Sequence, residues 1–149
     1  MRIPSIEGAA LLFEGEGSAA LLRQQGRKPI GCLALKMTDE EVVVAFQASV
    51  GGRGRIYFRS RRLPHHKDLW AWQTTKRYEI EWIAERFLPY VSRRRQEQLH
   101  ACVAASRVAS RRYTHSLTQE MFGKRLKDLT TVERRQYNTE SHRRWRVSH

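Results

Sequence analysis

Two acidic residues alternate with glycines in the segment Glu14-Gly15-Glu16-Gly17, directly after a short run of small and apolar residues. Carboxylate oxygens are hard ligands, and Mg²⁺ usually takes one or two of them together with phosphate oxygens. A carboxylate on a glycine-flanked turn can approach a nucleic-acid backbone closely, because glycine lacks side-chain bulk. The segment is therefore a candidate for metal-assisted chemistry on phosphodiesters; the alternative is a solvated acidic loop.

A second candidate is a strand-like segment in which every second residue is an arginine or a tyrosine. Because successive side chains of a strand point to opposite faces, these residues share one face, and small or apolar residues take the other. Arginine binds guanine through paired hydrogen bonds, and a two-stranded ribbon fits the major groove of DNA. We expect this face to contact DNA, the alternative being a solvated strand face; it comprises Arg53, Arg55, Tyr57, Arg59 and Arg61.

The charge of the whole chain points to the same class of partner. Its 149 residues include 28 Lys and Arg against 15 Asp and Glu, which gives a net charge of +13. Such an excess on a chain of one-domain size favours a polyanion, most often nucleic acid rather than a membrane surface. The excess is uneven, since residues 93–149 have a net charge of +9 and residues 1–92 of +4.

Several protein classes are excluded by composition. No apolar run approaches the ~18 residues of a membrane span, and the first residues lack the pattern of a signal peptide. Cys32 and Cys102 form no CxxC pair and indicate no disulfide framework. His65 and His66 lack spaced partners, which favours a loop over a metal site. We therefore expect an intracellular protein with reduced thiols.

The hydrophobic pattern predicts the helices and strands that position these candidates. Thr38 and Glu41 have the spacing of a capping box, which predicts the start of a helix. Trp70 and Trp72 share one face of a strand, which lies either in the core or beside the arginines. The predicted helices cover residues 6–13, 39–49, 76–87 and 92–108, and the predicted strands cover 18–24, 30–37, 53–61 and 69–74.

The C-terminal part predicts two more helices, over residues 118–129 and 132–145, and Thr130 with Glu133 has a second capping-box spacing. We take residues 1–110 as one domain and residues 111–149 as a basic helical extension. The extension is expected to add phosphate contacts outside the central site.

The segment 9–18, with the sequence AALLFEGEGS, resembles the defining motif of the LAGLIDADG homing endonucleases. The predicted order helix-strand-strand-helix-strand-strand-helix is also similar to that family, as are the stretch 37–41, the arginine strand and the segment 88–90 before a basic helix. The resemblance covers about residues 6–108. It implies an α+β fold, αββαββα, whose antiparallel sheet forms a saddle over DNA.

The resemblance also implies roles for individual residues. Glu16 stands where the family has a catalytic, metal-binding acid, with the carbonyl of Gly15 as a second ligand and Mg²⁺ or Mn²⁺ as the cofactor. Glu14 is expected to have a structural role at the end of the helix. Lys36 and Arg94 lie near the places of the basic catalytic residues. The register of Arg94 is uncertain by one residue, and a phosphate contact at a helix start is its alternative role.

The exposed face of the sheet is the part of the family fold that contacts double-stranded DNA. A single copy of the motif implies a homodimer that pairs through the motif helix, residues 6–14, with two active sites that each cut one strand. The DNA-binding residues implied are Arg23, Arg27, Lys28, Lys36, Arg53, Arg55, Tyr57, Arg59 and Arg61.

The predicted function is therefore a site-specific double-strand DNA endonuclease, of the kind that serves the homing of introns and other mobile elements. The resemblance implies an intracellular location, in the cytoplasm or nucleoid, in an organelle or in a phage-infected host cell. Leu11 departs from the family, which commonly has a small residue there that lets two motif helices pack closely. This departure supports the alternative of a non-cleaving relative, either a DNA-binding regulator or an RNA-binding maturase that helps an intron fold. A third possibility is a general basic nucleic-acid-binding protein, whose affinity falls steeply with salt.

Overall fold

The computed structural model describes residues 5–23, 25–60 and 63–147 of the chain. The chain divides into two compact units, Met1–Arg107 and Val108–His149, and each is considered by itself. Arg61, which the sequence predicted for the DNA-facing strand, lies outside the described residues. Among the residues that are described, no helix is both long and apolar enough to cross a membrane.

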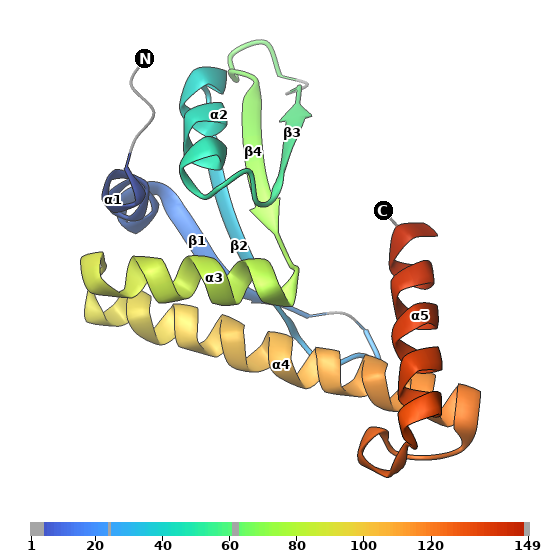
Figure 1. Ribbon diagram of the computed structural model, residues 1–149. Coiled ribbons are helices and arrows are strands. Elements are labelled where there is room, and N and C mark those ends of the chain that lie inside the picture. The colour runs from blue at the N-terminus through green and yellow to red at the C-terminus, as the bar shows by residue number, and fades with distance from the viewer. Residues whose placement is uncertain (1–4, 24, 61–62, 148–149) are drawn as a thin grey trace. The chain divides into compact units, whose positions relative to one another are not determined.

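The first unit has the predicted order of two helix-strand-strand repeats followed by helices (Figure 1), which confirms the α+β fold class. Its elements are α1 (Ile6–Glu16), β1 (Gly17–Leu22), β2 (Ile30–Met37), α2 (Glu40–Ser49), β3 (Arg55–Arg59), β4 (Leu69–Thr74), α3 (Arg77–Phe87), the short 3-10 helix η1 (Leu88–Tyr90) and the first part of α4 (Arg93–Phe122).

The four strands form one antiparallel sheet in the order β1-β2-β4-β3. Its register pairs Leu35 of β2 with Trp72 of β4, and Trp72 with Ile56 of β3. Residues opposite one another in a ladder lie on the same face, so these three side chains mark one face of the sheet. That face packs against the helices, since Leu35 and Trp72 are fully buried.

The core between the helices and this face is aromatic at its centre. Phe13 of α1, Phe46 of α2, Phe87 of α3 and Trp72 are fully buried, with ring centroids 4.9 to 6.3 Å apart. Trp70 lies on the same face, partly buried against the core, with its ring centroid 4.9 Å from that of Phe58. Both tryptophans therefore belong to the core side of the sheet and not to the side of the arginines.

α1 is longer than predicted and ends at Glu16. The hydroxyl of Ser5 caps its start by accepting a hydrogen bond from the Gly8 N–H at 3.1 Å. At the other end Gly17 has an extended backbone, with φ −80°, and its N–H donates to the Phe13 carbonyl. A Cβ on Gly17 would collide with the Phe13 ring, so this glycine, at the position where the helix ends, is needed for space. The motif helix therefore continues directly into β1.

Two predicted element starts are wrong. α2 is capped by Asp39, whose carboxylate accepts a hydrogen bond from the Glu41 N–H at 3.0 Å, so the capping box of Thr38 and Glu41 does not form. β3 begins at Arg55 and not at residue 53, because Gly54 has a left-handed backbone with φ +80° that separates the preceding loop from the ladder.

α4 is continuous from Arg93 to Phe122, whereas the sequence predicted one helix ending at residue 108 and another starting at 118. This stretch contains neither glycine nor proline, so no residue in it favours a break. The helix ends where Gly123 takes a left-handed φ of +63°, a common conformation after a helix C-terminus.

The second unit contains the end of α4, the 3-10 helix η2 (Leu126–Asp128) and α5 (Thr131–Val147). The predicted capping box before α5 is confirmed. The Glu133 N–H donates to the Thr130 hydroxyl at 3.2 Å, and the Thr130 N–H donates to the Glu133 carboxylate at 2.8 Å. Leu117 and Leu129 are buried and give this unit a small apolar core.

Candidate active site and nucleic-acid interface

Glu16 occupies the corner where α1 passes into β1, and its side chain is exposed. Among the described residues, none forms a hydrogen bond or an ion pair with its carboxylate. The carboxylate is thus a solvent-facing oxygen donor at a fixed point of the backbone, which is what a cation ligand requires.

Glu14, two residues earlier, makes specific contacts. Its carboxylate accepts a hydrogen bond from the Ser92 N–H at 3.2 Å and lies 3.9 Å from Nε of Arg95. Hydrogen bonding by Ser92 lowers the pKa of Glu14 below its usual value; burial opposes this shift, and the charges of Arg95 and Arg94 add to it. Glu14 therefore joins the end of α1 to the start of α4, the structural role expected for it.

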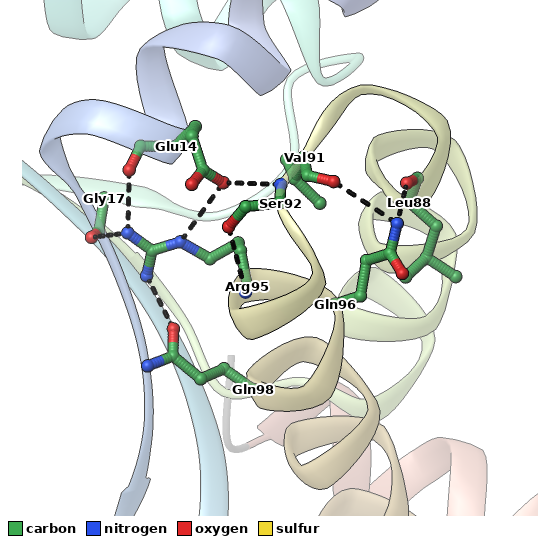
Figure 2. A network of polar contacts seen from close by, with 8 residues as sticks. All are labelled: Glu14, Gly17, Leu88, Val91, Ser92, Arg95, Gln96 and Gln98. Carbon is green, nitrogen blue, oxygen red and sulfur yellow. Dashed lines mark hydrogen bonds and ion pairs between the residues drawn. The ribbon is translucent and has the colours of Figure 1, made fainter.

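Figure 2 shows a second tie between the same two elements, made by Arg95. This side chain is only 6% exposed. Its Nη2 donates to the carbonyl of Glu14 at 3.0 Å and to that of Gly17 at 2.9 Å, and its Nη1 donates to Gln98 at 3.0 Å. The guanidinium also lies 5.2 Å from the centre of the Phe13 ring. Because the two carbonyls flank Glu16 in the chain, Arg95 fixes the backbone on both sides of it.

Gln96, the next residue of α4, fixes the turn before that helix (Figure 2). Its Nε2 donates to the carbonyl of Leu88 at 3.0 Å and to that of Val91 at 3.2 Å. The segment 88–90 and the start of α4 are thus held together, and the start of α4 in turn holds the corner that carries Glu16.

Sequence reasoning selected Arg94 as the basic residue of the site, but Arg94 is exposed and it is Arg95 that turns inward. The sequence does contain a signal for the inward position. Arg95, Leu99 and Cys102 are spaced by four and three residues, so they share one face of a helix, and all three are buried. Arg94 stays at the helix start as a candidate for a phosphate contact.

The face of the sheet opposite the helices carries the predicted basic surface. Arg55, Tyr57 and Arg59 of β3 are exposed and alternate with Ile56, which packs against the core, and with Phe58, which lies on the same side as Ile56 but is 52% exposed. The register puts Tyr57 opposite Ala71, and Ala71 opposite Lys36 of β2, which is also exposed. The structure therefore brings three residues of β3 and one of β2 onto one face, which we call the open face.

Lys36 connects this face to the acidic corner. It follows Leu35, the residue that pairs with Gly17, and so lies at the end of the sheet where α1 passes into β1. An ammonium group at this end favours a phosphate close to Glu16. The lysine and the carboxylate that the sequence singled out lie at the same end of the sheet.

Arg53 is placed elsewhere. Its guanidinium lies 3.8 Å from the centre of the Trp82 ring, and its Nη1 donates to the carbonyl of Val50 at 3.2 Å. Because β3 starts two residues later, Arg53 does not belong to the open face, and we remove it from the proposed DNA contacts. The other basic residues predicted to bind DNA are exposed in the hairpin between β1 and β2, at the end of these strands away from Glu16: Arg23, Arg27 and Lys28.

The oxygen donors at the corner fit a hard divalent cation only in part. In the described portion of the chain, no group of three or more His, Cys, Asp or Glu residues could hold a metal ion. Mg²⁺ is commonly bound by one or two carboxylates together with substrate phosphates and water. Glu16 and the carbonyl of Gly15 would therefore supply one part of such a site, completed by a phosphate or by a second chain.

Comparison with known proteins agrees with this geometry. No model of a protein family and no curated protein matches the sequence. The structure matches that of the homing endonuclease I-CvuI in complex with its target in the presence of Ca, with a TM-score of 0.57 and 14% identity, over 77% of this chain and 73% of that one. It also matches the group I intron-encoded homing endonuclease I-CeuI complexed with DNA, with a TM-score of 0.55 and 16% identity, over 80% of this chain and 62% of that one.

A third match is the LAGLIDADG meganuclease I-CpaMI bound to uncleaved DNA, with a TM-score of 0.56 and 19% identity, over 76% of this chain and 38% of that one. The matched part is thus well under half of the meganuclease and under two thirds of I-CeuI. The chain has the fold of the LAGLIDADG homing endonucleases, as the motif at its first helix predicted. At these identities the match concerns the fold.

Proposed function

We propose that the chain is a site-specific endonuclease for double-stranded DNA that uses a divalent metal and acts as a homodimer. The observation that supports this best is the exposed carboxylate of Glu16, fixed by buried Arg95 at the edge of a basic face. A protein that only bound nucleic acid would need the basic face alone. A bare carboxylate beside it repels phosphates, unless a cation lies between the two.

In this proposal the residues of one chain have three tasks. Arg55, Tyr57 and Arg59 contact base edges in the major groove, and Lys36 contacts a phosphate near the cleavage point. Glu16, with the carbonyl of Gly15, binds the metal. When bound, Mg²⁺ or Mn²⁺ supplies the activation of water and the neutralisation of the negative charge that grows on the phosphate.

A second chain completes the site. One chain supplies only one Glu16, and the metal-dependent cleavage of two DNA strands needs more carboxylates than that. The exposed face of α1 carries Glu7, Leu11 and Gly15, spaced by four residues each. Pairing of two chains through this face would bring their two Glu16 side chains near one symmetry axis. Each chain would then cut one strand of a roughly palindromic target.

The test is cleavage of a library of duplex DNA targets by purified protein with Mg²⁺. We expect wild type to cut a small set of targets on both strands, and Glu16→Gln to bind the same targets with cleavage lowered by at least a thousandfold. Glu85→Gln, which removes an exposed glutamate of α3, is the matched control and keeps activity. Absence of any cleavage by wild type, or equal cleavage by Glu16→Gln, contradicts the enzymatic proposal.

One observation favours a second candidate function. Leu11, on the motif helix, is 55% exposed, and a side chain of this size widens the separation of two paired helices. A non-cleaving relative would keep the basic face and bind DNA, or a structured intron RNA, selectively and without scission. Binding of this kind, unchanged by Glu16→Gln, supports the second candidate; a steep salt dependence without any sequence preference supports a general nucleic-acid-binding protein.

A further inference from the structure

The last helix sorts its side chains onto two faces. Within the second unit, one face of α5 is half-buried against the end of α4 and the connecting turn. The residues of this inner face are Glu133, Tyr137, Glu140, Ser141 and Arg144, at spacings of three, four and one that keep them on one side of a helix.

Ion pairs occupy the inner face. Arg144 bridges two carboxylates, with its Nη2 2.8 Å from Oε1 of Glu120 on α4 and its Nε 2.8 Å from Oε1 of Glu140. Nζ of Lys124 lies 2.8 Å from Oε1 of Glu133. All three glutamates of the second unit are thus paired with basic residues of the same unit, and their charges are balanced on this side of α5.

The outer face of α5 has the opposite character. Its residues are exposed, follow the helical spacing i, i+3, i+4, i+7 and i+11, and include no acid: Arg135, Asn138, Thr139, His142 and Arg146. Among the described residues, Arg135 and Arg146 form no ion pair. We call this set the outer stripe.

The dimensions of the outer stripe suit a nucleic-acid backbone. Arg135 and Arg146 are eleven residues apart on one helix, which corresponds to about 16 Å along its axis. Duplex DNA advances about 3.4 Å per base pair along its axis, so this length equals the axial rise of roughly five base pairs. The Asn138 amide between the two arginines is a further donor to phosphate oxygens, whereas the Thr139 hydroxyl already donates to the Arg135 carbonyl at 3.0 Å.

We propose that the outer stripe binds the phosphate backbone of duplex DNA as a second contact, separate from the bases contacted by the open face. This inference rests on the DNA binding in the proposed function but not on cleavage. Contacts to phosphates carry no sequence information and supply affinity and salt dependence. The open face then determines which sequence is bound, and the outer stripe determines how tightly any duplex is held.

The test is the salt dependence of binding by the full chain to a fluorescent random-sequence DNA duplex of 40 base pairs, in EDTA. The double variant Arg135→Gln, Arg146→Gln loses two phosphate contacts per chain. We expect the slope of log K against log salt to become shallower by about 1.8 per chain, and the affinity at low salt to fall severalfold. The control Arg77→Gln, Arg86→Gln removes the same charge from α3 and keeps the slope.

Two further variants distinguish a loss of phosphate contacts from a loss of helix structure, and a failure of the outer stripe from a failure of the open face. Arg135→Lys, Arg146→Lys keeps the charge and must keep the slope, even if the glutamine variant loses helix content by circular dichroism. Arg55→Gln, Arg59→Gln tests the open face in parallel. An unchanged slope in the outer-stripe variant, beside weaker binding by the open-face variant, overturns the outer stripe and leaves the proposed function standing. A loss confined to an RNA hairpin of the same length also overturns it, in favour of an RNA contact.

Discussion

The side chains of Glu14 and Glu16 differ in what surrounds them, although only one glycine separates them. Ser92 and Arg95 engage the first carboxylate, and the second faces solvent. Arg95 also fixes the backbone conformation at this corner. Its buried guanidinium donates hydrogen bonds to carbonyls on both sides of Glu16, which leaves that backbone little freedom. A positioning residue of this kind acts without touching the substrate.

We expect Arg95→Gln to lower the free energy of unfolding by about 2 to 3 kcal/mol, because it leaves two carbonyls at the corner without their charged donor. Urea denaturation measures this change. The neighbouring variant Arg94→Gln removes the same charge from an exposed position and is expected to change stability by less than about 0.5 kcal/mol. Equal stability of the two variants would contradict the role given to Arg95.

At the scale of elements, β3 is an edge strand whose start is firmly anchored. The Gly54 N–H donates to the buried Glu79 carboxylate at 3.1 Å, and the Gly54 carbonyl accepts from Gln47 at 2.9 Å. The Trp72 indole N–H donates to the carbonyl of Arg53 at 2.7 Å. The anchor fixes the register of the exposed β3 side chains, which otherwise would be weakly determined at a sheet edge.

Substitutions at the two ends of this segment are expected to have separate effects. Arg53→Gln loses the contact with Trp82 and a hydrogen bond to a carbonyl, which together stabilise the fold by about 1 to 2 kcal/mol.

Arg59→Gln, on the open face, lowers DNA affinity and relaxes sequence preference at one base, a change of about 1 to 3 kcal/mol for a paired contact to guanine. Thermal denaturation and binding selection measure the two effects; a binding defect in Arg53→Gln at unchanged stability would restore Arg53 to the DNA surface.

α5 carries ion pairs whose stabilising effect varies with pH. Hydrogen bonds from Arg143 and Arg144 lower the pKa of Glu140 to about 2, and Arg144 also lowers the pKa of Glu120. Because these folded-state values lie below the ordinary value of 4.5, the pairs stabilise the folded unit above about pH 4.5 and lose this effect as the pH falls toward 2.

We therefore expect the amides of α5 to lose protection from hydrogen exchange as the pH is lowered from 5 to 2.5, with protection corrected for the intrinsic exchange rate. Glu140→Gln weakens this pH dependence, because the group that titrates is gone. Glu85→Gln, on α3 of the other unit, serves as the control and leaves the response of α5 unchanged. An α5 whose protection is the same at both pH values would show that the ion pairs contribute nothing to it.

At the scale of the whole molecule, the proposed endonuclease requires two copies of the chain. The matched part of I-CpaMI is 38% of that chain, so the meganuclease is more than twice the size of the segment shared with this protein. The exposed apolar side chain on the motif helix, Leu11, is where a second copy would contact the first. On this face of α1, Leu11 lies between Glu7 and Gly15. Leu11 is the apolar centre of the face, and Gly15, which has no side chain, lets a second helix approach closely.

We expect Leu11→Glu to convert a dimer into a monomer, because two carboxylates would face one another across a desolvated contact. Light scattering after size-exclusion chromatography measures the mass, which is twice that of one chain for wild type. Val132→Glu, which places the same residue at an exposed apolar position of α5, is the control and stays dimeric. A monomeric wild type at micromolar concentration and in the presence of duplex DNA would contradict the homodimer.

Much of the fold and the identity of the candidate acids were predictable from sequence. The β2 boundaries, the order of the elements, the capping box at Thr130 and the alternation along β3 all depend on residues within a few positions of each other. Local periodicity and capping follow directly from backbone geometry, so they are visible without knowledge of the tertiary contacts. For the same reason the position of Glu16 at a helix end could be expected from its flanking residues.

Only the tertiary structure determined which basic residues are structural. Arg95 turns inward because it meets the carbonyls of Glu14 and Gly17, about eighty residues earlier in the chain, and Arg53 turns toward Trp82 of α3. The length of α4 was missed because a uniform helical stretch gives no stop signal before Gly123. Charge and periodicity are properties of a segment, but a guanidinium's partners are set by packing between distant segments. That packing separates the arginines that stabilise the fold from those that remain exposed on the open face.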